Sequence, residues 1–422
     1  MSNAFSKEER VAFETLLEGF NDAEVMSRNV DKYVTDGMTM ARANDTMWLP
    51  QPYIMQSFSG MDQTSNFKDV TQLSVPATLG YSKSVPWTMD AKELRDALQE
   101  QRLGDSARQK LASDINVAVL AAAATYGGLV VKKGTPTGFD DIATCDALMN
   151  EVGVEQFDRK LALSSRDYNR IAGNLAGRQN LENRTETAYD YARIGMVSGF
   201  ESFKLDYPKR LQAAAGGGSI TIDTRAAANN FYTTRATSTA VTGEVGNVDN
   251  RFQTITVSAT AGVVAGDSFT INGVTQCHLI SKEDTAQPKT FRVVSVPDGT
   301  HLVITPPLIS AQGATDAEKQ YQNAKVAGTG LATAAITWLN TVACAMNPFW
   351  HKGAIKLLPG SYAVDNNTGA SILRGKTDSG IEVVLQKQYD IATMKTRFRV
   401  DTLFGVVNAA PEQSGILLFD QT

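Results

Sequence analysis

The chain has 422 residues, 40 of them basic and 45 acidic, and a formal net charge of −5. This length predicts two or three domains. The charge balance, with no polybasic block, argues against wholesale nucleic-acid binding, and we expect no sequence-specific nucleic-acid binding. Cys145, Cys277 and Cys344 are odd in number and far apart, which predicts free thiols in a reducing cytoplasm. Residues 1–30 lack a signal-peptide core, and no apolar stretch reaches the roughly 20 residues of a membrane helix. We therefore expect a soluble protein without a membrane segment.

The first element expected is an amphipathic helix over residues 6–24, with Val11, Leu16, Leu17 and Phe20 on its apolar side. Its acidic residues outnumber its basic ones, so the segment has a net charge of −4 (2 minus 6): Lys7 and Arg10 against Glu8, Glu9, Glu14, Glu18, Asp22 and Glu24. Two interpretations stay open, a solvated helix face and a docking site for a basic partner.

Residues 50–88 are rich in Pro, Ser and Thr with scattered aromatic residues, a composition that favours extended β structure or a long arm. Trp48 and Trp87 flank this segment. Their indole rings are expected either to be buried within the chain or to anchor the arm against a neighbouring subunit.

A long helix is expected next. Asp90 and Glu93 have the spacing of a capping box, apolar residues continue at helical spacing, and Gly127-Gly128 is a stop signal. Such a helix of about 35 residues would be about 50 Å long, with a bend or break expected at Gly104.

The middle of the chain contains a compact all-β module. Helical and turn signals alternate over 139–215, and 213–219 reads as a flexible linker into this module. Strand patterns over 252–258, 266–274, 290–296 and 301–305, with turn signals at Asn272-Gly273 and 297–300, predict a small closed or nearly closed barrel over 220–307. A helix is expected within 310–345, followed by strands at 355–358, 381–385 and 398–403.

No catalytic, cofactor-binding or metal-binding motif stands out. Cys277-His278 is the one Cys/His cluster, and adjacent strand residues point to opposite faces. Gly328-Thr329-Gly330 lacks the rest of a dinucleotide loop, and neither a P-loop nor a nucleophile elbow is present. We therefore expect a protein that is not an enzyme and that uses no cofactor or metal.

Several segments resemble one protein family. They are Lys32-Tyr33 with 44–50, 107–112 leading to 128–131, 247–252 with the strand after it, and the turn at 298–301. In shared order these segments are similar to the major coat proteins of short-tailed podoviruses of the Salmonella phage type.

The resemblance implies an α+β fold of the HK97 phage-capsid type with an inserted β-barrel domain. Its parts would be an N-terminal arm over 1–48, an extended loop over 49–88, a spine helix with the peripheral and axial domain over 89–219, the inserted domain over 220–335 and a return to the outer domain over 336–422. The implied function is a major capsid protein that forms hexamers and pentamers of an icosahedral shell around double-stranded DNA. A scaffolding protein and a portal protein are the implied partners, and assembly in the host cytoplasm is the implied location.

The resemblance also implies contact sites. Glu14 stands where the family has an acidic residue that receives a basic scaffolding protein. The segment 239–251 corresponds to a loop that makes charge contacts with the adjacent capsomer, so Glu244, Asp249 and Arg251 are the candidates. Because this loop is rich in Thr, Val and Gly, Asp249 and Arg251 are alternatively expected to pair with each other.

Two other functions stay open on sequence grounds. A cytoplasmic enzyme with a β accessory domain would assemble its polar residues in space rather than in sequence. A receptor- or glycan-binding module would expose aromatic residues on the barrel, whereas Phe252, Phe269 and Phe291 lie within strand patterns typical of a core.

Overall fold

The structure is a computed structural model that describes most of the chain: residues 7–23, 25–33, 46–52, 54–67, 72–90, 97–176, 195–205, 209–216, 220–223, 249–310, 316–327, 331–362 and 370–422. The chain forms two compact units. The first comprises residues 1–47, 77–120 and 355–407, and the second comprises residues 48–76, 121–354 and 408–422. No helix among the described residues is long and apolar enough to span a membrane.

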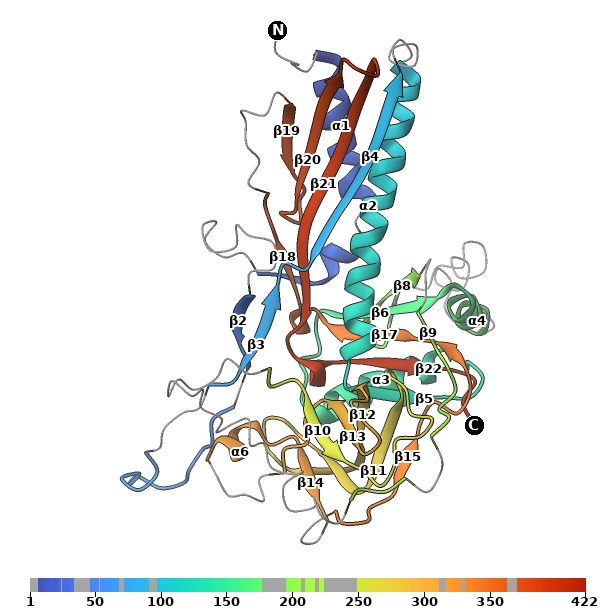
Figure 1. Cartoon of the computed structure of the whole chain (residues 1–422). Coiled ribbons are helices and arrows are strands. Elements are labelled where there is room, and N and C mark those ends of the chain that lie inside the picture. The colour runs from blue at the N-terminus through green and yellow to red at the C-terminus, as the bar shows by residue number, and fades with distance from the viewer. Residues whose placement is uncertain are drawn as a thin grey trace. The chain divides into compact units, whose positions relative to one another are not determined.

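The first unit is built on a sheet of strand order β1-β18-β21-β20-β19, with β4 pairing on β21 (Figure 1). Most pairs are antiparallel, and β1 runs parallel to β18. Its elements are α1 (Lys7–Ala23), η1 (Met26–Asn29), β1 (Asp31–Lys32), β4 (Tyr81–Asp90), most of α2 (Ala97–Tyr126), β18 (Ile355–Pro359), β19 (Ser371–Lys376), β20 (Glu382–Asp390) and β21 (Lys395–Asn408).

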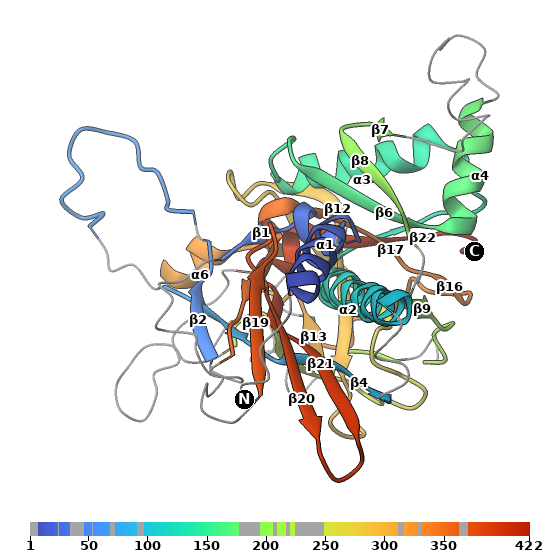
Figure 2. The same cartoon turned by 90° about the horizontal axis from the view of Figure 1, so that it is seen from above.

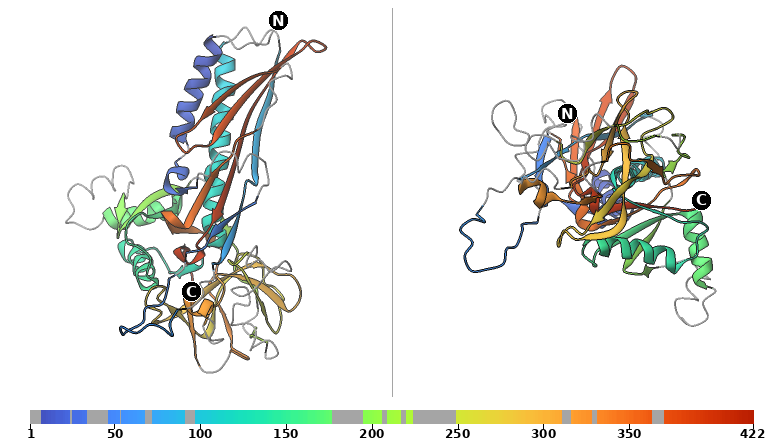
Figure 3. Two further views of the ribbon diagram at one scale, coloured as in Figure 1. Left: turned by 90° about the vertical axis from the view of Figure 1, so that its left-hand side faces the viewer. Right: turned by 90° about the horizontal axis from the view of Figure 1, so that it is seen from below.

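Helices α1 and α2 cover one face of this sheet, as Figures 1 and 3 show. A Cβ atom at Gly375 of β19 would lie 2.9 Å from Leu17, so this glycine lets α1 approach the strand closely. The helix expected over 6–24 is confirmed, because α1 covers Lys7–Ala23. Of the bend or break expected at Gly104, the break is wrong, because α2 continues through this residue. A Cβ atom placed at Gly104 would lie 3.6 Å from Leu16 of α1.

The expected start of the long helix lies at the edge of what is described. Asp90 is the last residue of β4 and pairs with Lys395 across the sheet. Residues 91–96, with Glu93, lie outside the described residues, and α2 is described from Ala97 onwards.

The second unit contains a sheet of strand order β5-β22-β17-β6-β8-β7, which Figure 2 shows beside α3 and α4. Its core combines buried side chains of this sheet and of both helices, among them Phe200, Phe349 and Ile171. Its elements are β5 (Leu129–Lys132), α3 (Phe139–Val152), β6 (Arg159–Ser164), α4 (Ser165–Ala176), β7 (Met196–Val197), β8 (Phe200–Leu205), β17 (Asn347–His351), η5 (Lys352–Ala354), η6 (Pro411–Gln413) and β22 (Ser414–Leu418).

The all-β module belongs to the second unit and is a closed ring of strands. Its sheet has the order β10-β13-β12-β11-β14, with β15 also pairing on β11. Residues 220–223 close the ring, because Ile336 N donates to Ile220 O (3.0 Å) and Asp223 N donates to Thr256 O (3.0 Å). Its elements are β10 (Gln253–Thr256), β11 (Ser268–Cys277), β12 (Asp284–Ser295), β13 (His301–Thr305), α6 (Asp316–Tyr321), β14 (Ala324–Val326) and β15 (Ile336–Trp338).

The chain enters and leaves this ring at one place. Ala214, which precedes the module, donates from its backbone N to the backbone O of Asn340, which follows the module (2.8 Å). The remaining short strands form two-stranded sheets: β9 (Arg210–Leu211) with β16 (Cys344–Ala345), and β2 (Thr46–Pro50) with β3 (Ser74–Thr78).

Two expectations within the module are wrong. The Asn272-Gly273 pair makes no hairpin turn, because it lies inside β11 as an irregularity with Gly273 at φ 82°. The bulge lets β11 pair with β15 before it and with β14 after it. The helix expected within 310–345 is also wrong beyond α6: Ala324 belongs to β14 and Trp338 to β15, and both strands pair with β11, which lies much earlier in the chain.

Candidate functional site

Helix α1 presents an acidic row to solvent. Phe13, Leu16 and Phe20 point inward and are buried. Glu9 is on the same inward side and is bound by the ammonium of Lys387 on β20. The inner side of the helix, one acid included, is therefore occupied by contacts within the first unit.

The opposite side of α1 carries Val11, Glu14 and Glu18, all exposed, with Val11 at 60%. Positions 11, 14 and 18 are neighbours on a helix surface because they differ by three, four and seven residues. We call these three residues the α1 row. An apolar side chain beside two carboxylates can bind a segment that combines a basic and an apolar residue. The resemblance implied a basic partner at Glu14.

Asp249 and Arg251, which lie just before β10 of the module, bind each other. The Arg251 guanidinium donates from Nε to Asp249 Oδ1 (3.0 Å) and from Nη2 to Asp249 Oδ2 (2.8 Å). The backbone N–H of Arg251 also donates to Asp249 Oδ1 (3.0 Å). This bidentate arrangement is the strong form of a charge-assisted hydrogen bond.

The Arg251 side chain is buried and fully engaged inside the second unit. Its Nη1 donates to Asn408 O (3.2 Å), and its guanidinium carbon lies 4.9 Å from the ring centroid of Phe252 and 5.7 Å from that of Tyr126. Of the three contact residues expected here, the structure brings Asp249 and Arg251 together. Glu244 lies outside the described residues.

The two tryptophans that flank the arm are both half-buried. Trp87 is on the helix-facing side of the first unit's sheet, and its ring stacks on Phe398 of the paired strand at 5.5 Å between centroids. Trp48 lies in β2. Between them, the described residues 54–67 expose several large apolar side chains: Met55, Phe58, Met61 and Phe67.

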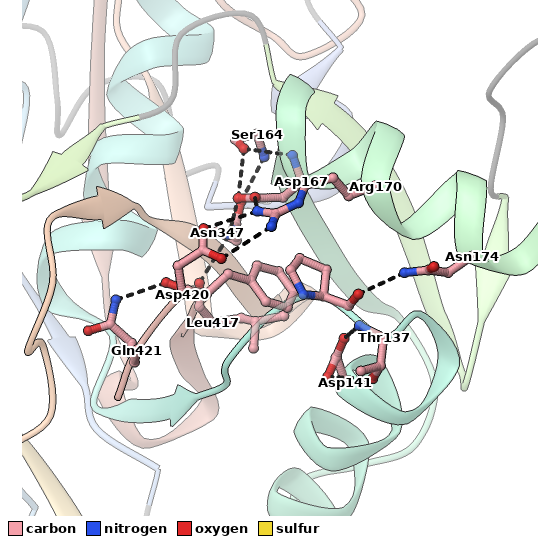
Figure 4. A network of polar contacts seen from close by, with 12 residues as sticks. Thr137, Asp141, Ser164, Asp167, Arg170, Asn174, Asn347, Leu417, Asp420 and Gln421 are labelled. Carbon is pink, nitrogen blue, oxygen red and sulfur yellow. Dashed lines mark hydrogen bonds and ion pairs between the residues drawn. The ribbon is translucent and has the colours of Figure 1, made fainter.

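A polar network fixes the C-terminal segment of the second unit (Figure 4). Asn347 is its centre: its Oδ1 accepts from Ser164 N (2.7 Å), and its Nδ2 donates to Asp167 Oδ2 (3.0 Å) and Leu417 O (3.2 Å). Arg170 forms a bidentate pair with Asp420 at 3.0 and 3.2 Å, which raises the pKa of Arg170. The network is structural, since each polar group binds another part of the same unit.

A further contact joins the module to η6, and sequence reasoning missed it. Lys289, fully buried in β12, donates to Asn323 O (3.2 Å) and lies 3.5 Å from Glu412 Oε1. Glu412 also accepts from the amide of Asn323. A lysine in a strand and a glutamate 123 residues later carry no sequence signal for this pairing.

The described residues show no reactive centre. The three cysteines are free and buried, and burial raises the pKa of each thiol, that of Cys344 to about 11. The described residues contain no cluster of three His, Cys, Asp or Glu side chains that could hold a metal ion. One hollow in the second unit, lined in part by Arg251, Lys282 and Tyr321, has a volume of about 90 Å³, small beside the roughly 300–1,000 Å³ of typical ligand pockets.

Comparison with known proteins gives a match over nearly the whole chain. The model of the P22 coat protein family, gene protein 5, matches residues 1–420. Among solved structures, the CUS-3 coat protein I-domain is 35% identical, with a TM-score of 0.23, and covers 30% of this chain and 99% of its own. The capsid of Helicobacter pylori bacteriophage KHP30 is 9% identical, with a TM-score of 0.45, and the match covers 93% of this chain and 88% of that one. The capsid of cyanophage P-SCSP1u is 10% identical, with a TM-score of 0.42, and the match covers 91% of this chain and 86% of that one.

Proposed function

The chain belongs to the P22 coat protein family, and from this premise we propose that it assembles around a scaffolding protein in the host cytoplasm, with the α1 row as the docking site. As a member of that family the chain is a major capsid protein of a bacteriophage. Many copies form the icosahedral shell of the virion, and the α+β fold is that of HK97-like phage capsid proteins. A portal protein is proposed as a further partner of this shell.

One observation carries the scaffold proposal: the acids of α1 are divided between two sides. Glu9 is committed to Lys387 inside the unit, whereas Glu14 and Glu18 are exposed beside the exposed Val11. Exposed carboxylates on a helix contribute little to the stability of the chain that carries them, about 0.3–0.5 kcal/mol per helical pair. Changing them should therefore alter partner binding without altering folding.

The first test is electron microscopy of the protein expressed alone and together with candidate scaffolding protein. Regular closed shells with the scaffold, and irregular shells or tubes without it, are expected. Glu14→Lys combined with Glu18→Lys should abolish the effect of the scaffold on particle regularity. The matched control is Glu151→Lys, a charge reversal at an exposed position of α3, which should leave regular shells. Regular, scaffold-filled shells from the double variant would refute the docking site.

We also propose that the loop over 239–251 ties neighbouring capsomers, with Glu244 as its contact residue and the Asp249–Arg251 pair holding the end of the loop. The pairing of Asp249 and Arg251 with each other supports this division, because their charges already have partners. A single exposed ion pair contributes about 0.2–1 kcal/mol, and repetition over a closed lattice adds such contributions together. Glu244→Lys should lower the temperature at which shells release DNA or dissociate and leave the unassembled chain unchanged. Equal stability of native and variant shells would contradict the proposed role of Glu244 between capsomers.

A further inference from the structure

Helix α2 ends at Tyr126 without a basic residue of its own in the last turn. The last turn of a helix leaves carbonyl groups without intrahelical partners and carries the negative end of the helix dipole. Two cations from distant parts of the second unit reach this end. Arg292 of β12 donates from Nη1 to Ala124 O, and Lys209 donates from Nζ to Thr125 Oγ1 at 2.8 Å.

The strand pattern of β12 explains how Arg292 comes to this position. Phe291 and Val293 point into the core of the module and are buried there. Thr290 and Arg292 alternate with them and point to the outer face of the barrel. Arg292 nevertheless has no exposed surface, which means that other parts of the second unit cover this face of the barrel.

The guanidinium of Arg292 donates its hydrogen bonds to backbone oxygens, and the charge of the nearby Asp267 carboxylate also acts on it. Besides Ala124 O, its guanidinium donates to Gly266 O (3.2 Å) and contacts Met346 Sδ (3.5 Å). Among the described residues, no carboxylate lies within ion-pair distance of it. Burial lowers its pKa to about 10, so the side chain stays charged at neutral pH. A buried cation of this kind depends strongly on the helix end being in place.

Thr290 binds the chain immediately after the helix. Its Oγ1 donates to Gly128 O (2.8 Å) and accepts from Val130 N (3.2 Å). The hydroxyl thus satisfies a donor and an acceptor where the chain passes from α2 into β5. Strand β5 then pairs with β22 at the edge of the second unit's main sheet.

We propose that Thr290 and Arg292 form an α2-end contact, through which the inserted module holds the last turn of α2 and the start of β5 in their native positions. The contact makes the order of residues 124–132 depend on the folded module. Through these two side chains of one strand, the module contacts a defined segment of the second unit that lies outside the module.

Amide hydrogen exchange of the unassembled full-length chain tests this proposal. Thr290→Val keeps the shape of the side chain and removes the hydroxyl, and Thr254→Val makes the same change at an exposed position of β10 in the same module. With Thr290→Val, amides of residues 127–132 should exchange about tenfold faster, the effect of about 1.4 kcal/mol expected when a buried hydrogen-bonding group loses its partner. Amides of β10 and β13 should be unchanged, and Thr254→Val should change neither group.

Substitution of Arg292 gives a second, graded measurement. Arg292→Met removes the charge and should accelerate exchange over 124–132 more than Arg292→Lys, which keeps a charge. Unchanged protection of residues 124–132 in Thr290→Val and Arg292→Lys would overturn the proposal. So would equal acceleration in the module's own strands, because the two residues would then stabilise only the barrel. If Arg292→Met does not yield folded protein, Thr290→Val and Arg292→Lys decide the question.

Discussion

Substitution of Asp249 by asparagine separates a contact within the chain from a contact between capsomers. Asparagine keeps the shape of the side chain and one oxygen acceptor, but it loses the charge and the second oxygen. In the structure this carboxylate accepts from the Arg251 backbone and from two guanidinium nitrogens, at 2.8–3.0 Å. The Arg251 side chain is only 10% exposed, whereas that of Asp249 is 24% exposed.

A charge-assisted hydrogen bond contributes about 1.5–3 kcal/mol, and partial exposure reduces this value. We therefore expect Asp249→Asn to lower the free energy of local unfolding around Arg251 by about 2 kcal/mol, which is roughly thirtyfold in the population of the open form. Hydrogen exchange of the amides of Gln253 to Thr256 in the unassembled chain measures this free energy of local unfolding. The control is Lys395→Met, which removes an exposed pair with Asp90 (3.3 Å) and should cost less than about 1 kcal/mol.

The opposite result has a clear meaning. If exchange in the unassembled chain is unchanged while assembled shells become less stable, Asp249 acts between subunits and the internal pair is dispensable. The argument from the bidentate geometry would then be refuted.

Three further predictions concern the described core and turns. Cys145 and Cys344 should resist alkylation in the folded chain at pH 8 and react readily after unfolding in urea, because burial raises the pKa of both thiols; fast labelling of the native protein would contradict this. The pKa of Asp298 is lowered from 3.8 to about 2, chiefly by the N–H of Thr300 and by His301. The turn should therefore be fully stabilised above pH 3.8 and lose that stabilisation as the pH falls towards 2, whereas Asp298→Asn should show no such transition in the Thr300 amide signal. Gly415→Ala should destabilise the second unit by about 1–3 kcal/mol in urea unfolding, because the added Cβ would lie 2.3 Å from Leu129 O; Gly134→Ala, where nothing lies within 4 Å, should be near neutral.

Patterns of local periodicity predicted much of the fold. The alternation of Phe252 to Ser258 and of residues 290–296 identified β10 and β12, and the helical spacing before Gly127 identified α2. Local signals misled where a distant partner decides the structure. Asn272-Gly273 has the composition of a turn, but β14 and β15 pair with the strand on either side of it and turn the pair into a bulge.

The candidate contacts show the same limit. The pairing of Asp249 with Arg251 could be expected because the two residues are close in sequence. The rest of the Arg251 environment, Tyr126 and Asn408 O, comes from segments more than a hundred residues away. Nothing in the local pattern around Arg292 signals burial, since strand alternation alone places it on the outer face of the barrel.

The closed ring of the module has a consequence for engineering and for evolutionary exchange. Because the incoming and outgoing strands are hydrogen-bonded to each other at Ile220 and Ile336, the module is a cassette whose two ends meet. A foreign domain with adjacent termini could occupy the same junction and be displayed in many copies on a particle. A successful graft would also have to provide a hydrogen-bond donor, preferably a cation, for the carbonyl of Ala124, because Lys209, the other cation at this helix end, binds Thr125 Oγ1 instead. Insertion at this junction therefore carries one chemical requirement in addition to the geometric one.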